Sequence, residues 1–183
     1  MLTKVTSFLD TVKSRRSVRD YADREVPREM IDRCVEAAGY APTACDSQGW
    51  RFIIARGPLR ERIVSECLGQ RPVPNRWASK APVIVVIAFA RSLVTHRIGA
   101  RLKGTRYDLI DAGIAGEHFV LQAAELGLGT CWIGWFRKRR LRKILDLPSS
   151  WEVAALLTLG FPSSEPVAKK VKPLEEIREY RSE

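Results

Sequence analysis

The stretch Arg15-Arg16-Ser17-Val18-Arg19 carries three guanidinium groups and one hydroxyl within five residues. A guanidinium binds a phosphate through two parallel hydrogen bonds and keeps its positive charge at neutral pH. On its own, a cluster this short is equally compatible with a solvated surface patch. The cluster therefore allows an anion-binding site near the N-terminus, and two further motifs downstream bear on the choice between these two interpretations.

Both downstream motifs are rich in residues that shape loops and turns. They are Ala41-Pro42-Thr43-Ala44-Cys45-Asp46-Ser47-Gln48-Gly49-Trp50 and Gly127-Leu128-Gly129-Thr130-Cys131-Trp132-Ile133-Gly134. By residue type alone, the first is a helix-to-strand loop anchored by a tryptophan, and the second is a helix-ending glycine followed by a strand. In this order and at these separations, the three motifs resemble those of the nitroreductase family of flavoproteins.

The resemblance covers residues 12–180 and implies an α+β fold. The expected architecture is a mixed, largely antiparallel sheet flanked by helices, in a single flavin-binding domain over residues 1–183. The resemblance further implies a homodimer with FMN at the subunit interface, where a long helix also lies. The implied activity is ping-pong hydride transfer from NADH or NADPH, through FMN, to a small oxidised acceptor such as a nitroaromatic, quinone or enone. No side-chain acid or base stands out, so the flavin is expected to carry the chemistry.

The family's motifs also assign candidate cofactor-binding residues. Those expected at the phosphate and ribityl chain are Arg15, Arg16, Ser17 and Arg19, with Arg16 also near the pyrimidine edge of the flavin. Those expected to contact the flavin from the second motif are Pro42, Thr43, Ala44, Asp46 and Gln48. Those expected to pass over one flavin face, with a backbone N–H toward N5, are Trp132, Ile133 and Gly134. Lys169 is the expected C-terminal contact to the phosphate, with Lys170 or Lys172 as alternatives after a register shift.

Three positions depart from the family's usual pattern. Asp46 stands where Asn is usual, Gly49 where Pro is usual, and Val171 where Arg is usual. An ionised carboxylate accepts hydrogen bonds but cannot donate them, and its charge opposes negative charge on a reduced flavin. Asp46 therefore points elsewhere, has a raised pKa, or belongs to a site with different flavin chemistry.

Hydrophobic patterning predicts the elements that carry these motifs. Helices are expected over 27–39, 58–68, 108–127 and 137–146, with a short helical pattern from Pro173, and strands over 51–56, 83–89, 130–134 and 153–160. The 108–127 segment is apolar around most of its circumference, apart from a narrow stripe containing Asp111, His118, Gln122 and Glu125. Such a helix is buried on most sides, and a subunit interface could supply part of the cover. His118 is expected to be a hydrogen-bonded residue at the core edge or the interface, not a catalyst.

Composition limits the other classes of function. The chain has 183 residues and a net charge of +10, with no apolar run long enough for a membrane span. Its first residues lack the apolar core of a signal peptide, so a cytoplasmic location is expected. Four well-separated cysteines and two histidines make neither a CxxC pair nor a zinc site.

Two alternative functions remain open. One is a specialised flavin enzyme on the same fold, of the dehalogenase or flavin-consuming type, whose lid pattern cannot be placed in 91–107. The other is a basic nucleic-acid-binding module, since six of the seven residues in 137–143 are basic. No aromatic residues alternate with these charges as a base-stacking platform requires. The segment is therefore interpreted as a solvated helix face, and no nucleic-acid partner is expected.

Overall fold

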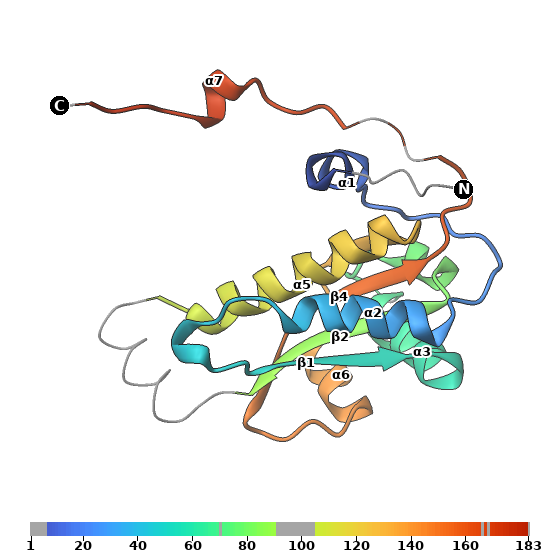
Figure 1. Ribbon diagram of the computed structural model, residues 1–183. Coiled ribbons are helices and arrows are strands. Elements are labelled where there is room, and N and C mark those ends of the chain that lie inside the picture. The colour runs from blue at the N-terminus through green and yellow to red at the C-terminus, as the bar shows by residue number, and fades with distance from the viewer. Residues whose placement is uncertain (1–6, 70, 91–104, 166, 168, 183) are drawn as a thin grey trace.

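The computed structural model describes residues 7–69, 71–90, 105–165, 167 and 169–182. Its helices are α1 (Phe8–Ser14), α2 (Arg28–Gly39), α3 (Gly57–Ile63), α5 (Tyr107–Glu125), α6 (Lys138–Ile144) and α7 (Leu174–Ile177) (Figure 1). Its strands are β1 (Trp50–Ala55), β2 (Val83–Ala90), β3 (Gly129–Ile133) and β4 (Trp151–Gly160). Three short helical turns are η1 (Ala44–Asp46), η2 (Val64–Leu68) and η3 (Arg76–Lys80).

The four strands form one sheet in the order β1-β2-β4-β3, and every neighbouring pair is antiparallel. The sheet is therefore antiparallel, as largely expected from the sequence, and a parallel bridge between Ser17 and Thr130 lies outside its strands. The predicted strands are confirmed, with ends that differ by at most two residues. The predicted 58–68 helix is a regular helix only as far as Ile63, and the chain continues as the wider turn η2.

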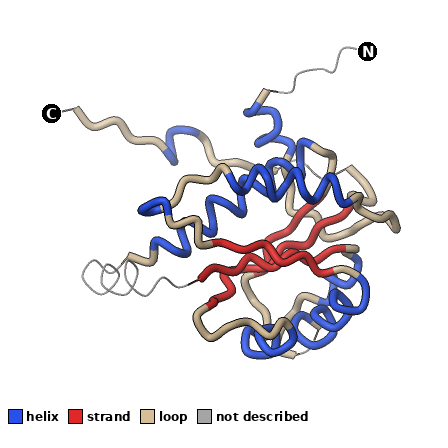
Figure 2. Tube along the Cα trace, turned by 60° about the horizontal axis from the view of Figure 1, so that its bottom comes forward, coloured by secondary structure: helices blue, strands red, loops and turns tan. Residues whose placement is uncertain are grey.

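Helices cover both faces of the sheet (Figure 2). On one face, α2 and α5 pack over the sheet around Phe119, whose ring stacks on that of Phe52 at 5.5 Å between centroids. On the other face, α3, η2, η3 and α6 enclose a second core that includes Leu68 and Leu141. Strand β2 lies between the two cores, and residues 83–89 are all buried. This explains why the segment is apolar without alternation.

The long helix α5 spans the whole first layer. Its buried side includes Ala112, Phe119 and Ala123. Gly116 is required where α5 crosses β3, because a β-carbon there would overlap the Trp132 ring and lie 2.8 Å from Ile87 Cδ1. His118 lies at the edge of the core with Nδ1 3.2 Å from the carbonyl oxygen of Ala37.

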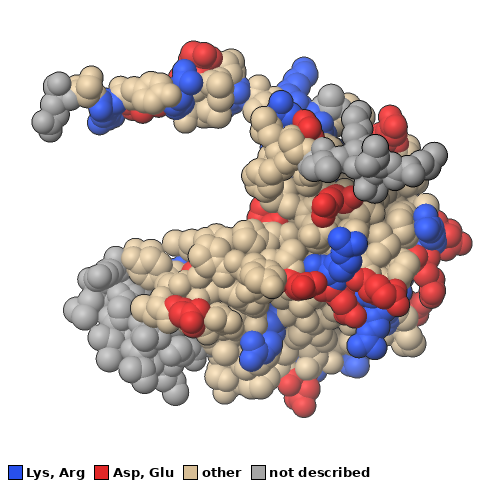
Figure 3. Space-filling view, in the orientation of Figure 1, with Lys and Arg blue, Asp and Glu red and all other residues tan. Residues whose placement is uncertain are grey.

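The two terminal segments carry apolar side chains on their surfaces. Helix α1, which the sequence did not predict, buries none of its residues, and Phe8 is 75% exposed. The described part of the tail after β4 extends away from the body of the domain (Figures 1 and 3). It exposes Val171, Leu174 and Ile177. Among the described residues, none of the helices has the length and apolar character needed to cross a membrane.

Candidate functional site

The arginine segment pairs with the outer edge of β3. The Val18 N–H donates to the carbonyl oxygen of Thr130 at 2.9 Å, and Ser17 forms the parallel bridge to the same residue. Gly129 permits this close approach, since a β-carbon there would lie 2.7 Å from the Val18 side chain. The structure therefore brings the first and third sequence motifs together through their backbones.

Arg15, Ser17 and Arg19 all act electrostatically on one buried thiol, that of Cys131. Burial raises the pKa of this thiol, while Arg19, Ser17 and Arg15 act in the opposite direction. Arg15 lies toward α5, where its Nε approaches Glu117, whereas Arg19 lies toward η3. The Arg19 guanidinium also lies over the Trp77 ring, 5.5 Å from its centroid.

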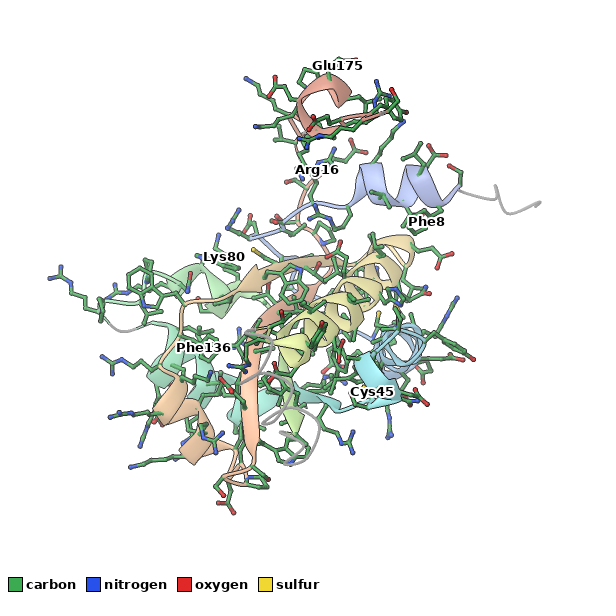
Figure 4. The ribbon with its side chains drawn as sticks, turned by 90° about the vertical axis from the view of Figure 1, so that its left-hand side faces the viewer. Phe8, Arg16, Cys45, Lys80, Phe136 and Glu175 are labelled. Carbon is green, nitrogen blue, oxygen red and sulfur yellow. The ribbon has the colours of Figure 1, made fainter. Side chains whose placement is uncertain are left out.

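Arg16 is oriented differently from the other two arginines. Its guanidinium donates to the Val167 carbonyl from Nε at 2.8 Å, and also to the carbonyls of Arg15 and Lys13. In Figure 4 it lies between the body of the domain and the C-terminal tail. The sequence-based role of Arg16 at the pyrimidine edge stays a prediction, but in this structure its guanidinium binds backbone carbonyls. Lys169 is exposed two residues beyond Val167.

A hollow of about 170 Å³ opens between the arginine segment and the end of α5. It is lined by Ser14, Arg15, Arg16, Val18, Ala124, Gly127, Leu128, Gly129, Thr130 and Pro162. Two guanidinium-bearing residues and the glycine-rich start of β3 thus border the same space. Gly134, at the far end of β3, is exposed, and nothing lies within 4 Å of the position a β-carbon would take.

The loop of the second motif has an irregular backbone. Cys45, Asp46 and Gln48 have φ angles of 54°, 48° and 41°, in the left-handed region that few residues other than glycine adopt. The Gln48 side chain donates to Asp46 Oδ1 at 2.7 Å. The Gln48 N–H donates to Thr43 Oγ1 at 3.3 Å. Two of the three polar side chains that the sequence assigns to the flavin, those of Asp46 and Gln48, therefore bind each other in this structure.

A buried carboxylate attaches this loop to α5. The Ala44 N–H lies 3.2 Å from each carboxylate oxygen of Asp111, which is 7% exposed. Asp111 is in the second turn of the helix, whereas the hollow beside the arginine segment reaches Ala124. These two positions are separated by about 20 Å along a helix that rises ~1.5 Å per residue. One copy of the chain therefore holds the second motif far from the first, as Figure 4 shows for Cys45 and Arg16.

Glu117 is a site neighbour that the sequence motifs did not mark. Its Oε1 lies 3.8 Å from Nε of Arg15, and its Oε2 accepts a hydrogen bond from the Trp132 indole at 3.4 Å. It follows Gly116, the residue against which the Trp132 ring packs. The only signal in the sequence is its place as one of few carboxylates on an apolar helix. Within the described ranges, no cluster of three or more metal-ligating side chains occurs.

The basic helix α6 lies apart from this site, on the other face of the sheet. Lys138 pairs with Glu152 at 2.8 Å, and Arg140 pairs with Glu66. Arg142 donates to the carbonyls of Pro148 and Trp151. Several cations of this helix thus bind acidic side chains or backbone carbonyls. The lid segment, for which no dehalogenase pattern could be placed from sequence, lies mostly in 91–104, outside the described residues.

Comparison with known proteins gives several matches over most of the chain. A putative NADH dehydrogenase/NAD(P)H nitroreductase of Methanothermobacter thermautotrophicus is 31% identical, covering 86% of this chain and 78% of that protein. An FMN reductase [NAD(P)H] of Bacillus subtilis is 28% identical, covering 94% and 73%. Human iodotyrosine deiodinase 1 is 26% identical, covering 97% and 69%.

Solved structures and family models agree with these relatives. The crystal structure of a nitroreductase family protein from Clostridium difficile 630 superposes with a TM-score of 0.79 at 26% identity, covering 96% of this chain and 99% of that one. The α+β fold expected from the sequence is therefore the fold of a solved nitroreductase family protein. The Nitroreductase family model matches residues 12–161, which contain all three motifs. The chain belongs to the Nitroreductase family.

Proposed function

We propose that this protein is an FMN-dependent NAD(P)H oxidoreductase. The observation that supports this most is the pairing of the segment Arg15–Arg19, which carries three guanidinium groups and one hydroxyl, with the outer edge of the glycine-containing strand β3. Family membership and the relatives named for NAD(P)H and FMN point to the same chemistry.

The donor set at the edge of β3 suits a flavin phosphate. Two guanidinium groups and a hydroxyl can supply the charge-assisted hydrogen bonds that a phosphate dianion requires. We assign phosphate binding to Arg15, Ser17 and Arg19, and a further cation to Lys169 on the adjoining tail. The space beside Gly134 leaves room for a flat ring against the backbone of residues 132–134.

The remaining residues of the site act by binding and orientation. FMN, when bound, accepts hydride from a nicotinamide and passes it to an oxidised acceptor. The side chain of Ile133 is buried in the second core, so its contribution is made by its backbone. The backbone N–H groups of residues 132–134 would orient the reactive edge of the flavin. No side chain in the site is assigned a proton-transfer role, and water would supply the protons.

We further propose that two copies of the chain complete each site. Helix α1 and the tail expose large apolar side chains, including Phe8 and Leu174. The surface over α5 also carries few charged side chains (Figure 3). Because loop 43–48 lies at the opposite end of α5 from the arginine segment, a second copy running the other way would bring its own loop to this site. Pro42, Thr43, Ala44, Asp46 and Gln48 would then contact the flavin across the interface.

Analytical ultracentrifugation tests this assembly. At micromolar concentration the protein should sediment as one species of twice the chain mass, because the exposed apolar side chains need cover. A monomer that still binds FMN stoichiometrically would contradict the shared site.

Isolation of the protein tests the cofactor. The purified protein should show flavin absorbance and one FMN per chain after denaturation. Under anaerobic conditions, NADH or NADPH should bleach the flavin and an added nitroaromatic or quinone should restore the colour. Lack of stoichiometric binding after incubation with FMN would rule out the proposed function.

A specialised flavin enzyme is the second candidate. The observation that favours it is the similarity to human iodotyrosine deiodinase 1 along 97% of the chain. Reoxidation of the reduced protein by an aryl halide, with release of halide, would support this candidate over a general reductase. Reoxidation by quinones or nitroaromatics without halide release would support the first.

A further inference from the structure

A carboxylate stands among the groups assigned to the flavin phosphate. Glu117 Oε1 is 3.8 Å from the Nε of Arg15, and the Glu117 side chain is 46% exposed. Arg15 is less accessible, with 20% of its side chain exposed. An anion at this position partly neutralises the arginine and repels any second anion that approaches it. A carboxylate is therefore unexpected beside a site that binds the phosphate anion.

The carboxylate is held by a second, neutral partner. Glu117 Oε2 accepts a hydrogen bond from Trp132 Nε1 at 3.4 Å. The indole is itself fixed, since its ring packs against the helix at Gly116, where no side chain intervenes. If Arg15 turned to another anion, Glu117 would therefore keep one hydrogen-bond donor. The geometry allows the arginine to exchange partners without leaving the carboxylate unsatisfied.

We propose that Glu117 sets the affinity and selectivity of the site for phosphorylated flavin. Its carboxylate pairs with Arg15, and the phosphate of FMN has to displace it from that arginine. Glu117 thus weakens binding of FMN but not of riboflavin, which has the same ring and ribityl chain and no phosphate. The inference depends on the proposed function, because it requires that Arg15 binds the phosphate.

Glu117→Gln is the decisive variant. The amide oxygen can still accept the Trp132 hydrogen bond at nearly unchanged volume, while the charge is removed. At low ionic strength we expect FMN to bind about 3- to 10-fold more tightly, with the affinity for riboflavin unchanged within about 2-fold. The difference should shrink as salt is added, since exposed charges are screened. Inorganic phosphate should likewise bind more tightly to the cofactor-free variant.

Glu61→Gln is the matched control. Glu61 is exposed on α3, in the other layer, so this variant makes the same change in net charge away from the site. It should leave the ratio of FMN to riboflavin affinity unchanged.

The indole N–H resonance of Trp132 gives a readout without cofactor. This resonance should stay close to its native position in Glu117→Gln and move in Glu117→Ala. Both Glu117 variants should tighten FMN binding.

Two outcomes separate failure of this inference from failure of the proposed function. If Arg15→Ala lowers the preference for FMN over riboflavin, but Glu117→Gln weakens FMN binding or changes both flavins equally, the phosphate site stands and Glu117 only positions Arg15. If the wild-type protein and Arg15→Ala bind FMN and riboflavin alike, the phosphate assignment itself is wrong and the inference fails with it.

Discussion

The two ends of α5 place site residues by different means. At its C-terminal end, the arginine segment is held by backbone pairing to β3, and three of the five residues of this segment are cations. At its N-terminal end, loop 43–48 has left-handed residues and depends on the buried carboxylate of Asp111. Side chains of the arginine segment can therefore be replaced without loss of its backbone pairing to β3. The conformation of loop 43–48 depends instead on one hydrogen-bond acceptor, the carboxylate of Asp111.

The strongest test of the cationic end is Arg15→Ala/Arg19→Ala. Each lost charge-assisted hydrogen bond weakens binding by about 1.5–3 kcal/mol, so FMN affinity should fall ~100-fold or more. The fold should persist, because Val18 still pairs with Thr130 through backbone atoms. Fluorescence titration with FMN measures the loss, and circular dichroism checks the fold.

Arg139→Ala/Lys143→Ala is the control for this double variant. Both residues are exposed on α6, so the same two charges are removed on the other face of the sheet. FMN affinity should change by less than about 2-fold at moderate salt. Full retention of FMN by the Arg15/Arg19 variant after dialysis would show that the phosphate lies elsewhere.

The middle of α5 can be tested with a pair of glycines. Gly116→Ala forces a β-carbon into Trp132 and Ile87, and overpacking of this kind destabilises a protein by about 1–3 kcal/mol. Gly113 has nothing within 4 Å of its β-carbon position, so Gly113→Ala should instead stabilise the helix by about 0.5–1 kcal/mol. Urea unfolding gives both values. A loss of stability in Gly113→Ala would mean that a second copy packs on that side of the helix.

The loop end should fail when its acceptor is removed. Asp111→Ala leaves the Ala44 N–H without its carboxylate partner, at an expected loss of about 1–3 kcal/mol in the free energy of unfolding. Asp111→Asn keeps an acceptor oxygen and should restore part of that loss. Hydrogen exchange at Ala44 reports the loop directly: fast exchange only in Asp111→Ala is the expected pattern, and equal exchange in all three proteins would contradict it.

The smallest effect concerns Asp46. If its carboxylate lies beside the flavin, it lowers the reduction potential by opposing negative charge on the reduced ring. Asp46→Asn should therefore raise the midpoint potential at neutral pH, by an amount on the order of 10–30 mV for a two-electron couple. Dye-equilibrium titration measures the shift. An unchanged potential would remove Asp46 from the proposed site residues.

The sequence predicted the parts of the molecule that rest on regular patterns. The apolar run at 83–89 belongs to a strand between two cores, and residues 108–127 belong to a helix as predicted. Within one chain this helix is buried along one side, and not on most sides as its composition had led us to expect. The prediction for His118, a hydrogen-bonded residue at the core edge, also agrees with its contact to Ala37. Each of these features follows from local periodicity or burial.

What the sequence did not predict depends on long-range contacts. Helix α1 has only seven residues and buries none of them, so it is too short for apolar periodicity to identify it as a helix. The contact of Arg16 with Val167 joins residues 151 positions apart. The pairing of Glu117 with Arg15 likewise depends on how α5 crosses β3. Periodicity and motif spacing contain no information about such pairs.

The position of the arginine segment has a consequence for solubility. Strand β3 is the last strand of the sheet, and an uncovered last strand is a template for aggregation. The Val18 N–H binds the Thr130 carbonyl on this edge, and the positively charged Arg16 and Arg19 flank the pair Ser17–Val18. Deletion of residues 15–19 would therefore do more than remove cofactor ligands, because it would expose a strand edge able to pair with that of another molecule.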